Sequence, residues 1–341
     1  MVFFDVVIIG AGPAGLKCAQ TLSNTKYRVL VLEKNSQVGP KVCAGGLTGK
    51  DLDYLKLPPE LIDFSYRKVK LHVNGLPFRV RDDKDFIYTI DRKNLGQWQV
   101  NKLSGVKNIK IKIGAKVSKI DKGFVVVNKR KIGYGFLVGA DGSASIVRQC
   151  LGIKPKSTNV AIQYILPTKG YQDLELFFDS NLFSAWYAWI FPHRHYVSIG
   201  CGANPAILPA DKLNSNFKNW LDKRGIDVSG GKYEAFAINC DYQGYRFGNV
   251  FLAGDAGGFA SELTGEGIYQ ALVTGEEVAK TILNSNYQPR KINDLLTTKR
   301  RHNKVLKFLI ECGKFRTMVF YLGAMLFGVP FFKKKAIGLL G

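Results

Sequence analysis

The stretch DVVIIGAGPAGL, residues 5–16, decides the fold class of this chain. Residues 6–9 are a short apolar run that ends at a glycine, which is typical of a strand buried on both faces of a parallel sheet. In the pattern that follows, Gly10 permits a tight turn, Gly12 lets a pyrophosphate approach the backbone, and Gly15 lets the next helix pack on the strand. The spacing therefore predicts a βαβ unit that binds a dinucleotide.

The residues around this pattern complete the expected dinucleotide site. A helix that begins at Pro13 and Ala14 would direct its N-terminus, the positive end of its dipole, at the pyrophosphate. A second strand is expected at residues 28–32, and Glu33 at its end is placed to accept hydrogen bonds from ribose hydroxyls. Lys34 follows directly and belongs to the same predicted site.

Composition limits the class of protein. The chain has 341 residues, 46% hydrophobic and 22% charged, which suits about two globular domains and excludes disordered, collagen-like and coiled-coil chains. Lys and Arg total 49 against 27 Asp and Glu, so the formal net charge is +22. A field of this sign favours anionic partners, namely nucleic acid, acidic lipid headgroups or phosphorylated ligands.

The cysteines and the start of the chain indicate an intracellular protein. Six cysteines are scattered without a CxxC pair, which favours a reducing compartment over a disulfide scaffold. The first residues have neither the basic segment nor the cleavage site of a secretory signal, and the sequence has no run of about 20 apolar residues. His193 and His195 have no further ligand residues near them in the sequence, so we expect no metal site.

The remaining segments suggest an insertion into the first unit. Residues 159–238 carry aromatic-rich alternating patterns typical of an antiparallel sheet, and Asn74-Gly75 predicts a hairpin. A buried-strand run returns at 249–253, and a helical pattern follows at 265–283. The predicted class is therefore α/β, a Rossmann-like domain with an inserted antiparallel sheet and a helical tail. We expect the dinucleotide-binding domain at 1–62, 92–158 and 241–285, the substrate domain at 63–91 and 159–240, and a basic helical region at 286–341.

Two later segments indicate which dinucleotide binds. Asp141-Gly142 follows one strand-like run and Gly254-Asp255 follows another. With GxGxxG first, the three segments resemble the flavoprotein hydroxylase superfamily, of which para-hydroxybenzoate hydroxylase is the archetype. The resemblance implies FAD, with Asp255 holding its ribityl chain and Asp141 near its pyrophosphate. By itself, Asp-Gly is also a common β-turn pair.

Residues 264–268 and Arg92 complete the expected FAD site. Where the last long helix opens, backbone N–H groups around Gly265, Gly267 and Ile268 would stabilise negative charge at the N1/O2 edge of the reduced flavin. Arg92, at the start of a helix expected from Asp91, is placed like the arginine that such families hold near FAD. A plain helix start and a solvated arginine are the alternative interpretations.

Within this superfamily, two segments resemble the geranylgeranyl reductase family. PKVCAGGL, residues 40–47, is similar to the family's K-x-C-G-(G/D)-G-L loop, with Ala44 where glycine is usual. YAWIFP, residues 187–192, matches the family's YxWxFP motif. The resemblance extends from residue 1 to about 285 and implies that Cys43 and Ala44 lie near the flavin. It also implies an activity, the reduction of C=C bonds in isoprenoid chains.

Cys43 and Tyr187 are our candidates for supplying a proton or positioning the substrate. Hydride delivered from reduced FAD to one alkene carbon must be matched by a proton at the other, in a pocket that excludes water. Strand alternation would place Tyr187, Trp189 and Phe191 on one face, where they could bind an isoprenoid chain. The alternatives are a buried structural cysteine and aromatic residues that fill a core between sheet and helix.

The leading hypothesis is an FAD-dependent reductase that saturates geranylgeranyl or polyprenyl chains of a membrane lipid. An FAD-dependent aromatic monooxygenase shares the three FAD motifs, although YxWxFP argues against it. A basic nucleic-acid-binding flavoprotein is the third hypothesis, but the sequence holds no nucleic-acid-binding motif. No second GxGxxG follows a strand, so electrons would come from transiently bound NAD(P)H or from a ferredoxin.

The C-terminal segment predicts contact with a membrane surface. Residues 286–341 hold twelve Lys or Arg and two acidic residues, and residues 317–332 form an uncharged stretch between Lys314, Arg316 and Lys333–Lys335. This stretch is too short to span a bilayer comfortably, so we expect an interfacial segment whose flanking lysines bind anionic headgroups. A helix packed on the protein is the alternative. The expected location is the cytoplasm, with peripheral attachment to a membrane.

Overall fold

The computed structural model describes residues 1–168 and 170–326 and contains both helices and strands. The helices are α1 (Pro13–Thr21), α2 (Gly49–Leu55), α3 (Arg92–Asn101), α4 (Ile146–Cys150), α5 (Ala210–Lys223), α6 (Ile268–Leu283), α7 (Arg290–Glu311) and α8 (Arg316–Leu326). Short 3-10 helices are η1 (Pro59–Leu61), η2 (Gly254–Gly257) and η3 (Gly313–Phe315).

The strands form two large sheets and one small one. They are β1 (Val2–Ile9), β2 (Val29–Leu32), β3 (Gly46–Thr48), β4 (Phe64–Tyr66), β5 (Lys68–Val73), β6 (Leu76–Arg81), β7 (Ile87–Thr89), β8 (Ile109–Lys112), β9 (Val117–Asp121), β10 (Phe124–Val127), β11 (Arg130–Gly139), β12 (Thr158–Leu166), β13 (Glu175–Phe178), β14 (Ala188–Pro192), β15 (Val197–Ala203), β16 (Lys232–Asn239), β17 (Arg246–Phe247) and β18 (Val250–Leu252).

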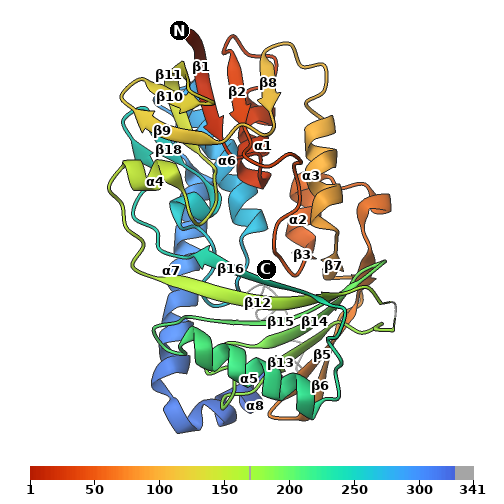
Figure 1. Ribbon diagram of the computed structural model, residues 1–341. Coiled ribbons are helices and arrows are strands. Elements are labelled where there is room, and N and C mark those ends of the chain that lie inside the picture. Colours follow the sequence, from red (N-terminus) through yellow and green to blue (C-terminus); the bar gives the residue numbers. More distant parts are fainter. Residues whose placement is uncertain (169, 327–341) are drawn as a thin grey trace.

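The first large sheet is the upper layer in Figure 1 and contains the predicted βαβ unit. Its strands run in the order β17-β18-β11-β1-β2-β8, and β18, β11, β1, β2 and β8 are mutually parallel. Strands β9 and β10 extend from β11 as an antiparallel ribbon. Because β18 pairs with β11, the predicted return of the chain to the first unit is confirmed.

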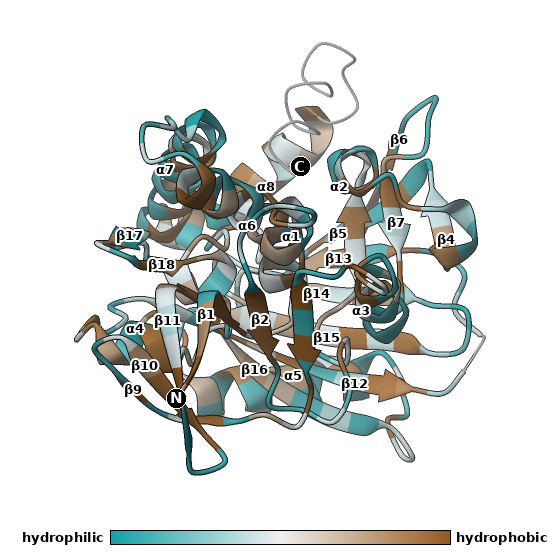
Figure 2. Ribbon diagram, turned by 90° about the horizontal axis from the view of Figure 1, so that it is seen from above, coloured by the Kyte–Doolittle hydropathy of each residue, from teal (hydrophilic) through white to brown (hydrophobic). Residues whose placement is uncertain are grey.

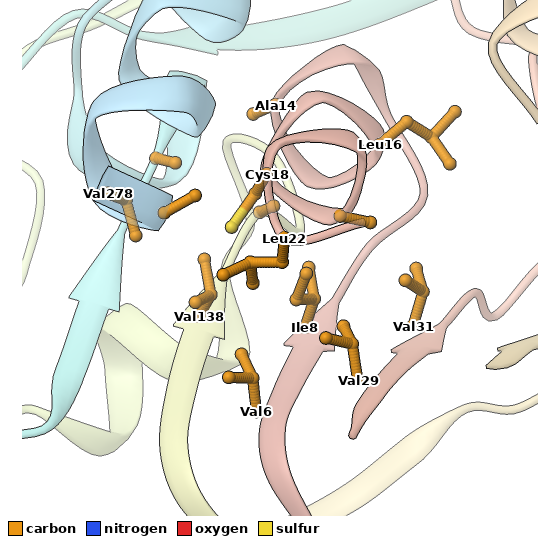
Figure 3. Close-up of a cluster of buried hydrophobic side chains, with 14 of the residues drawn as sticks. Val6, Ile8, Ala14, Leu16, Cys18, Leu22, Val29, Val31, Val138 and Val278 are labelled. Atoms are coloured by element: carbon orange, nitrogen blue, oxygen red, sulfur yellow. The ribbon is translucent and has the colours of Figure 1, made fainter. Parts of the chain in front are cut away.

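Apolar periodicity explains how α1 and α6 cover this sheet. All four residues of β2 are buried, and β2 and most of β1 are coloured as hydrophobic in Figure 2. Cys18 and Leu22 at the sheet-facing side of the α1 segment point toward Ile8 of β1 and Val138 of β11 (Figure 3). Val278 of α6 belongs to the same buried cluster, so one core fixes two helices on one face of the sheet.

The turn between β1 and α1 requires glycine at two positions for different reasons. Gly10 has φ +101°, and a Cβ on it would lie 2.3 Å from the Ala140 carbonyl oxygen. A Cβ on Gly15 would lie 2.0 Å from the Gly10 carbonyl oxygen. The helix can therefore start directly beneath the end of β1, at the edge where ligands bind in such sheets.

The second large sheet is the lower layer in Figure 1, in the order β16-β12-β15-β14-β13-β5-β6. The β5–β6 hairpin turns at Asn74 (φ +43°) and Gly75 (φ +91°), and Val73 pairs with Leu76, so the predicted two-residue turn is confirmed. Helix α5 packs on this sheet through a cluster that includes Phe217 and Trp220. The division of the chain into three domain segments stays a prediction.

The C-terminal helices run beside both layers. Helix α7, drawn in blue, passes from the first sheet to the second in Figure 1, and α8 follows next to the second sheet. Arg316, which borders the predicted interfacial segment, is buried, and its guanidinium donates to the Leu309 and Ile310 carbonyl oxygens at the end of α7. Residues 327–341, which include Lys333–Lys335 and part of the predicted interfacial segment, lie outside the described residues.

Candidate active site

A cavity of about 1200 Å³ lies where the two large sheets meet. Its lining joins the carboxyl ends of β1 and β2 to β13 and β14 of the second sheet and to α8. Every predicted cofactor and substrate residue except Gly15 lines it. These residues are Gly10, Gly12, Pro13, Ala14, Glu33, Lys34, Cys43, Ala44, Arg92, Asp141, Gly142, Asp255, Gly265, Gly267 and Ile268 at one end and Tyr187, Trp189 and Phe191 at the other.

The N-terminus of α1 faces this cavity as a site for an anion. In the described chain no side chain caps this helix, whose N-cap residue is Gly12 and whose first residue is Pro13. An added Cβ on Gly12 would meet no described atom within 4 Å, so the backbone here borders open space. Uncapped N–H groups at a helix start bind phosphate well, because the helix dipole adds to their hydrogen bonds.

Three buried polar atoms border the same end of the cavity. Among residues 1–168 and 170–326, no hydrogen-bond partner lies within reach of Arg92 Nε, Gln99 Oε1 or Asp141 Oδ1. Buried polar atoms are seldom left unpaired in a folded protein. Together with the uncapped helix, they fit a large polar group with phosphates and hydroxyls, which is the chemistry of the FAD that the resemblance implies.

Asp141 also has a structural task that the sequence did not indicate. Its Oδ2 accepts from the Ile146 N–H at 2.7 Å and from the Val147 N–H at 3.4 Å, which satisfies the start of α4. Burial raises the pKa of this carboxyl above its ordinary value. Its predicted contact with the pyrophosphate therefore depends on Oδ1, and it stays a prediction.

Glu33 holds the turn as well as facing the cavity. Its Oε2 accepts from the Ala11 N–H and its Oε1 from the Asn35 N–H, each at 2.9 Å. A carboxylate accepts about four hydrogen bonds. Both oxygens thus keep capacity for the predicted ribose hydroxyls.

Asp255 has a partner that the sequence analysis missed. Lys41 Nζ lies 2.9 Å from Asp255 Oδ2, and Ser143 Oγ donates to the same oxygen at 3.3 Å. These contacts connect the loop after β2, the segment after β11 and η2 across the cavity wall. A lysine in a loop gives no sequence signal for such a pairing, because 214 residues separate Lys41 from Asp255.

The cysteine loop and the end of β14 pack against each other, so the two family-type segments form one unit. A Cβ on Gly45 would lie 2.5 Å from His193 Cε1, and a Cβ on Gly46 would lie 2.6 Å from the Phe191 ring. His193 is buried, with Nε2 2.8 Å from the Ala44 carbonyl oxygen and Nδ1 2.9 Å from Asp63 Oδ2. His193 therefore fixes the position of the loop that carries Cys43.

The opposite end of the cavity is apolar and aromatic. Tyr187, Trp189 and Phe191 all line it, as strand alternation predicts. Phe178 packs on Tyr187 and on Phe320 of α8, with ring centroids 5.5 and 5.4 Å apart. Other aromatic residues of this segment serve the alternative role of core filling. Phe177 and Phe183 pack in the cluster beneath α5.

The two candidate proton donors are placed differently. The Tyr187 hydroxyl donates to the Thr264 carbonyl oxygen at 2.6 Å, and burial, followed by the nearby Glu266 and Cys43, raises its pKa above the ordinary tyrosine value. Cys43 Sγ accepts from the Gly45 N–H at 3.4 Å. The Tyr187 proton is thus held by a carbonyl and is a weak acid.

Glu266 is a titratable residue of the cavity that the sequence analysis did not single out. It lines the cavity next to Gly265 and Gly267, and Lys50 Nζ lies 3.4 Å from its Oε2. Burial raises its pKa to about 7, with Asp51 acting in the same direction and Lys50 opposing it. The sequence analysis assigned a role only to the backbone N–H groups of this segment. The raised pKa of the Glu266 carboxyl follows from its burial in the folded protein, which the sequence does not show.

The chain is similar to known proteins along most of its length. Residues 4–170 match the family described as pyridine nucleotide-disulphide oxidoreductase. An uncharacterised protein of Methanosarcina barkeri is 30% identical over 92% of this chain and 83% of that protein. A digeranylgeranylglycerophospholipid reductase of Methanococcus vannielii is 28% identical over 93% and 86% of the two chains. The solved structure of a geranylgeranyl bacteriochlorophyll reductase-like protein from Thermoplasma acidophilum has a TM-score of 0.72 at 17% identity, covering 96% and 88%, and shares this fold.

Proposed function

The chain belongs to the geranylgeranyl reductase family of FAD-binding oxidoreductases, and we propose that it saturates C=C bonds in the isoprenoid chains of a membrane lipid. One observation carries the proposal. A single cavity runs from the uncapped N-terminus of α1 to the aromatic wall of Tyr187, Trp189 and Phe191. Such a cavity suits a dinucleotide at one end and a long apolar chain at the other.

Each end of the cavity has its own part in the chemistry. Bound FAD supplies hydride donation to carbon. The chain's own residues bind the anionic end of this cofactor at α1 and exclude water from the reacting carbons with the aromatic wall. A nearby acid must add the second hydrogen as a proton. An isolated alkene has no substituent that could stabilise the charge left on the other carbon after hydride transfer.

The apolar residues of helix α8 favour the proposal that the substrate is bound to a membrane, because they lie on two sides of the helix. Val319, Phe320 and Gly323 line the cavity, while Met318 and Leu322 are 55% and 52% exposed. A surface helix normally keeps one polar face. Lys304 and Lys307 of α7 and Lys314, two residues before α8, are also exposed. We propose that the outer face of α8 lies in the headgroup region of an anionic bilayer and that lipid chains reach the cavity past this helix.

The described residues contain no helix that is both long enough and apolar enough to cross a membrane.

The proposed activity is tested with the FAD-loaded protein under anaerobic conditions. Dithionite reduces the flavin, so that the test does not depend on the predicted electron donors, NAD(P)H and ferredoxin. A phospholipid with geranylgeranyl chains is then added. We expect the flavin to be reoxidised and the lipid mass to rise by two units per saturated bond. A phospholipid with saturated phytanyl chains is the control. Reduced flavin that persists with the unsaturated lipid until oxygen is admitted would contradict the proposal.

The membrane proposal has its own test in the paired substitution Leu322→Glu and Met325→Glu. Both side chains are more than half exposed, so the thermal unfolding temperature should change little while sedimentation with phosphatidylglycerol vesicles falls at least tenfold. Ile113→Glu, at a residue 56% exposed before β9, is the matched control and should sediment like the parent. Equal sedimentation of the paired variant would remove α8 as the membrane face.

A further inference from the structure

We propose that Glu266 is the proton donor of this reductase, an inference that rests on the proposed function. Three features carry it. Glu266 borders the reaction cavity beside the glycines at the start of α6, its charge acts on Tyr187, and it also lines a second cavity that has exposed residues in its wall. Neither Cys43 nor Tyr187 combines these features.

Glu266 forms part of the wall between two cavities. The second cavity has a volume of about 250 Å³ and lies between α2, the loop before α6, the start of α6, and α7. Its lining includes Lys291 and Asp294, whose side chains are exposed, so this cavity reaches the protein surface. The carboxyl of Glu266 can therefore give a proton to one cavity and regain it from the other.

The surroundings of Glu266 favour a group that both holds and releases a proton near neutral pH. Its side chain is 21% exposed, and burial raises its pKa to about 7. Lys50 and Asp51 of α2 act on it with opposite signs, and Gln270 of α6 hydrogen-bonds to it. The charged or titratable side chains of α7 that share the second cavity with it are Lys291, Asp294, Lys299 and His302. A pKa near the working pH is what general acid catalysis requires.

The reaction balances with this assignment. One carbon of the C=C bond would receive a hydride, which is one proton with two electrons, from bound reduced FAD. The π electron pair forms the second C–H bond with the Glu266 proton as the carboxyl O–H bond breaks. The product is the saturated chain, the flavin is oxidised, and the Glu266 carboxylate takes up a proton from solvent through the second cavity.

Glu266→Gln tests the assignment because the amide keeps the shape and the contact with the cavity but holds no acidic proton. We expect unchanged FAD content and an alkene-dependent flavin reoxidation rate that falls about 10²- to 10⁴-fold. The parent rate should decline above about pH 7, where Glu266 loses its proton, and the variant should lack this decline. Glu266→Asp should restore part of the rate. Glu60→Gln, at an exposed carboxylate, is the matched control.

A spectroscopic measurement tests the same group without turnover. The infrared difference spectrum of the parent minus Glu266→Gln, both with oxidised FAD, should contain a protonated-carboxyl band that disappears with a midpoint near pH 7. A parent that yields no saturated lipid overturns the proposed function together with this role. A parent that yields it while Glu266→Gln reacts equally fast, or a spectrum without the titrating band, overturns the Glu266 assignment alone. A Cys43→Ala variant that loses the rate while Glu266→Gln retains it would make Cys43 the donor.

Discussion

At the scale of single residues, close backbone approach determines where this site lies. Gly45 and Gly46 let the cysteine loop rest directly on His193 and Phe191, and the buried His193 holds the Ala44 carbonyl oxygen. Any side chain at these two glycines would push Cys43 away from the second sheet. The loop is thus positioned by the absence of side chains at two residues and by one histidine across the cavity wall.

Gly45→Ala tests this packing. Its φ of +77° costs an alanine about 1–2 kcal/mol, and the close approach of the added Cβ to His193 and to the Ile90 carbonyl oxygen adds about 1–3 kcal/mol of overpacking. Gly75→Ala is the matched control, because its φ is +91° but no described atom lies within 4 Å of the added Cβ. We expect Gly45→Ala to lower the free energy of unfolding in urea by about 1–3 kcal/mol more than Gly75→Ala. Equal losses of unfolding free energy in the two variants would mean that the atoms around Gly45 move aside at little cost.

Asp255→Ala tests the cofactor end of the cavity. Removal of this carboxylate leaves Lys41 without its partner at 2.9 Å and removes the group that we expect to bind the ribityl chain. We expect FAD affinity to fall about tenfold, or about 1.4 kcal/mol, measured as flavin retained after dialysis. Asp121→Ala, which breaks the exposed pair with Lys119, is the control and should retain FAD like the parent. Unchanged flavin content in Asp255→Ala would refute our placement of the cofactor.

At the scale of elements, α6 connects the helices that surround the cavity. Its Gly275 allows α1 to approach so closely that a Cβ would lie 2.2 Å from the Ala14 carbonyl oxygen. One turn of α6 carries Glu276, which hydrogen-bonds to Tyr54 of α2 and Lys280 and forms ion pairs with Lys17 of α1 and Lys291 of α7. A single carboxylate therefore links four helices.

This carboxylate should make stability depend on acid pH. Burial alone would raise the pKa of Glu276, but the hydrogen bonds from Lys280 and Tyr54 and the charges of Lys280 and Lys291 lower it from 4.5 to about 2. A lowered native pKa stabilises the fold above pH 4.5, and this contribution is lost as the pH falls toward 2.

Glu276→Gln is the variant that isolates this contribution. We expect its free energy of unfolding at pH 7 to fall by roughly 1–3 kcal/mol and its loss of stability between pH 4.5 and 2 to be smaller than the parent's. Urea titrations across this pH range measure both effects. Glu311→Gln, where the pair with Lys307 is exposed, should behave like the parent. A parent-like pH profile in Glu276→Gln would contradict the assignment.

At the scale of the whole molecule, the two sheets are joined by a buried ion pair. Arg148 of α4 is 2% exposed, and its guanidinium lies 3.1 Å from Asp241 Oδ2, just beyond β16 of the second sheet. The same oxygen accepts from the Lys156 N–H, where the chain leaves the first sheet for the second. We expect this junction to fix the position of the first sheet, which borders the cofactor end of the cavity, relative to the second sheet, which borders the substrate end.

Asp241→Ala should weaken the whole molecule because it leaves the Arg148 charge buried without its partner. Loss of one member of a buried pair costs about 3–5 kcal/mol, whereas loss of an exposed pair costs under about 1 kcal/mol. Urea unfolding should separate Asp241→Ala from the control Asp173→Ala, whose partner Lys70 is on the surface. A loss of under about 1 kcal/mol in Asp241→Ala would mean that the junction does not depend on this pair.

The sequence by itself determined the parts that depend on near neighbours along the chain. Apolar runs and turn glycines predicted β1, α1, β2, the β5–β6 hairpin and the return of the chain at β18, because strand burial and positive φ are local requirements. The resemblance of short sequence segments to known flavoproteins identified the family and its cofactor, FAD. The sequence also identified Glu33, Asp141 and Asp255, because each follows a predicted strand. The carboxyl ends of parallel strands lie at the same edge of a sheet, so residues after them come close together.

Only the tertiary structure decided how these residues act together. Glu266 lies against Lys50, 216 residues away, and its raised pKa arises from burial that no local pattern encodes. His193 holds the cysteine loop through Asp63 and Ala44, and Arg316 donates a hydrogen bond to the Leu309 carbonyl oxygen near the end of α7. Desolvation and charge pairing depend on distances through space, so they come into existence only when the two sheets pack around the cavity.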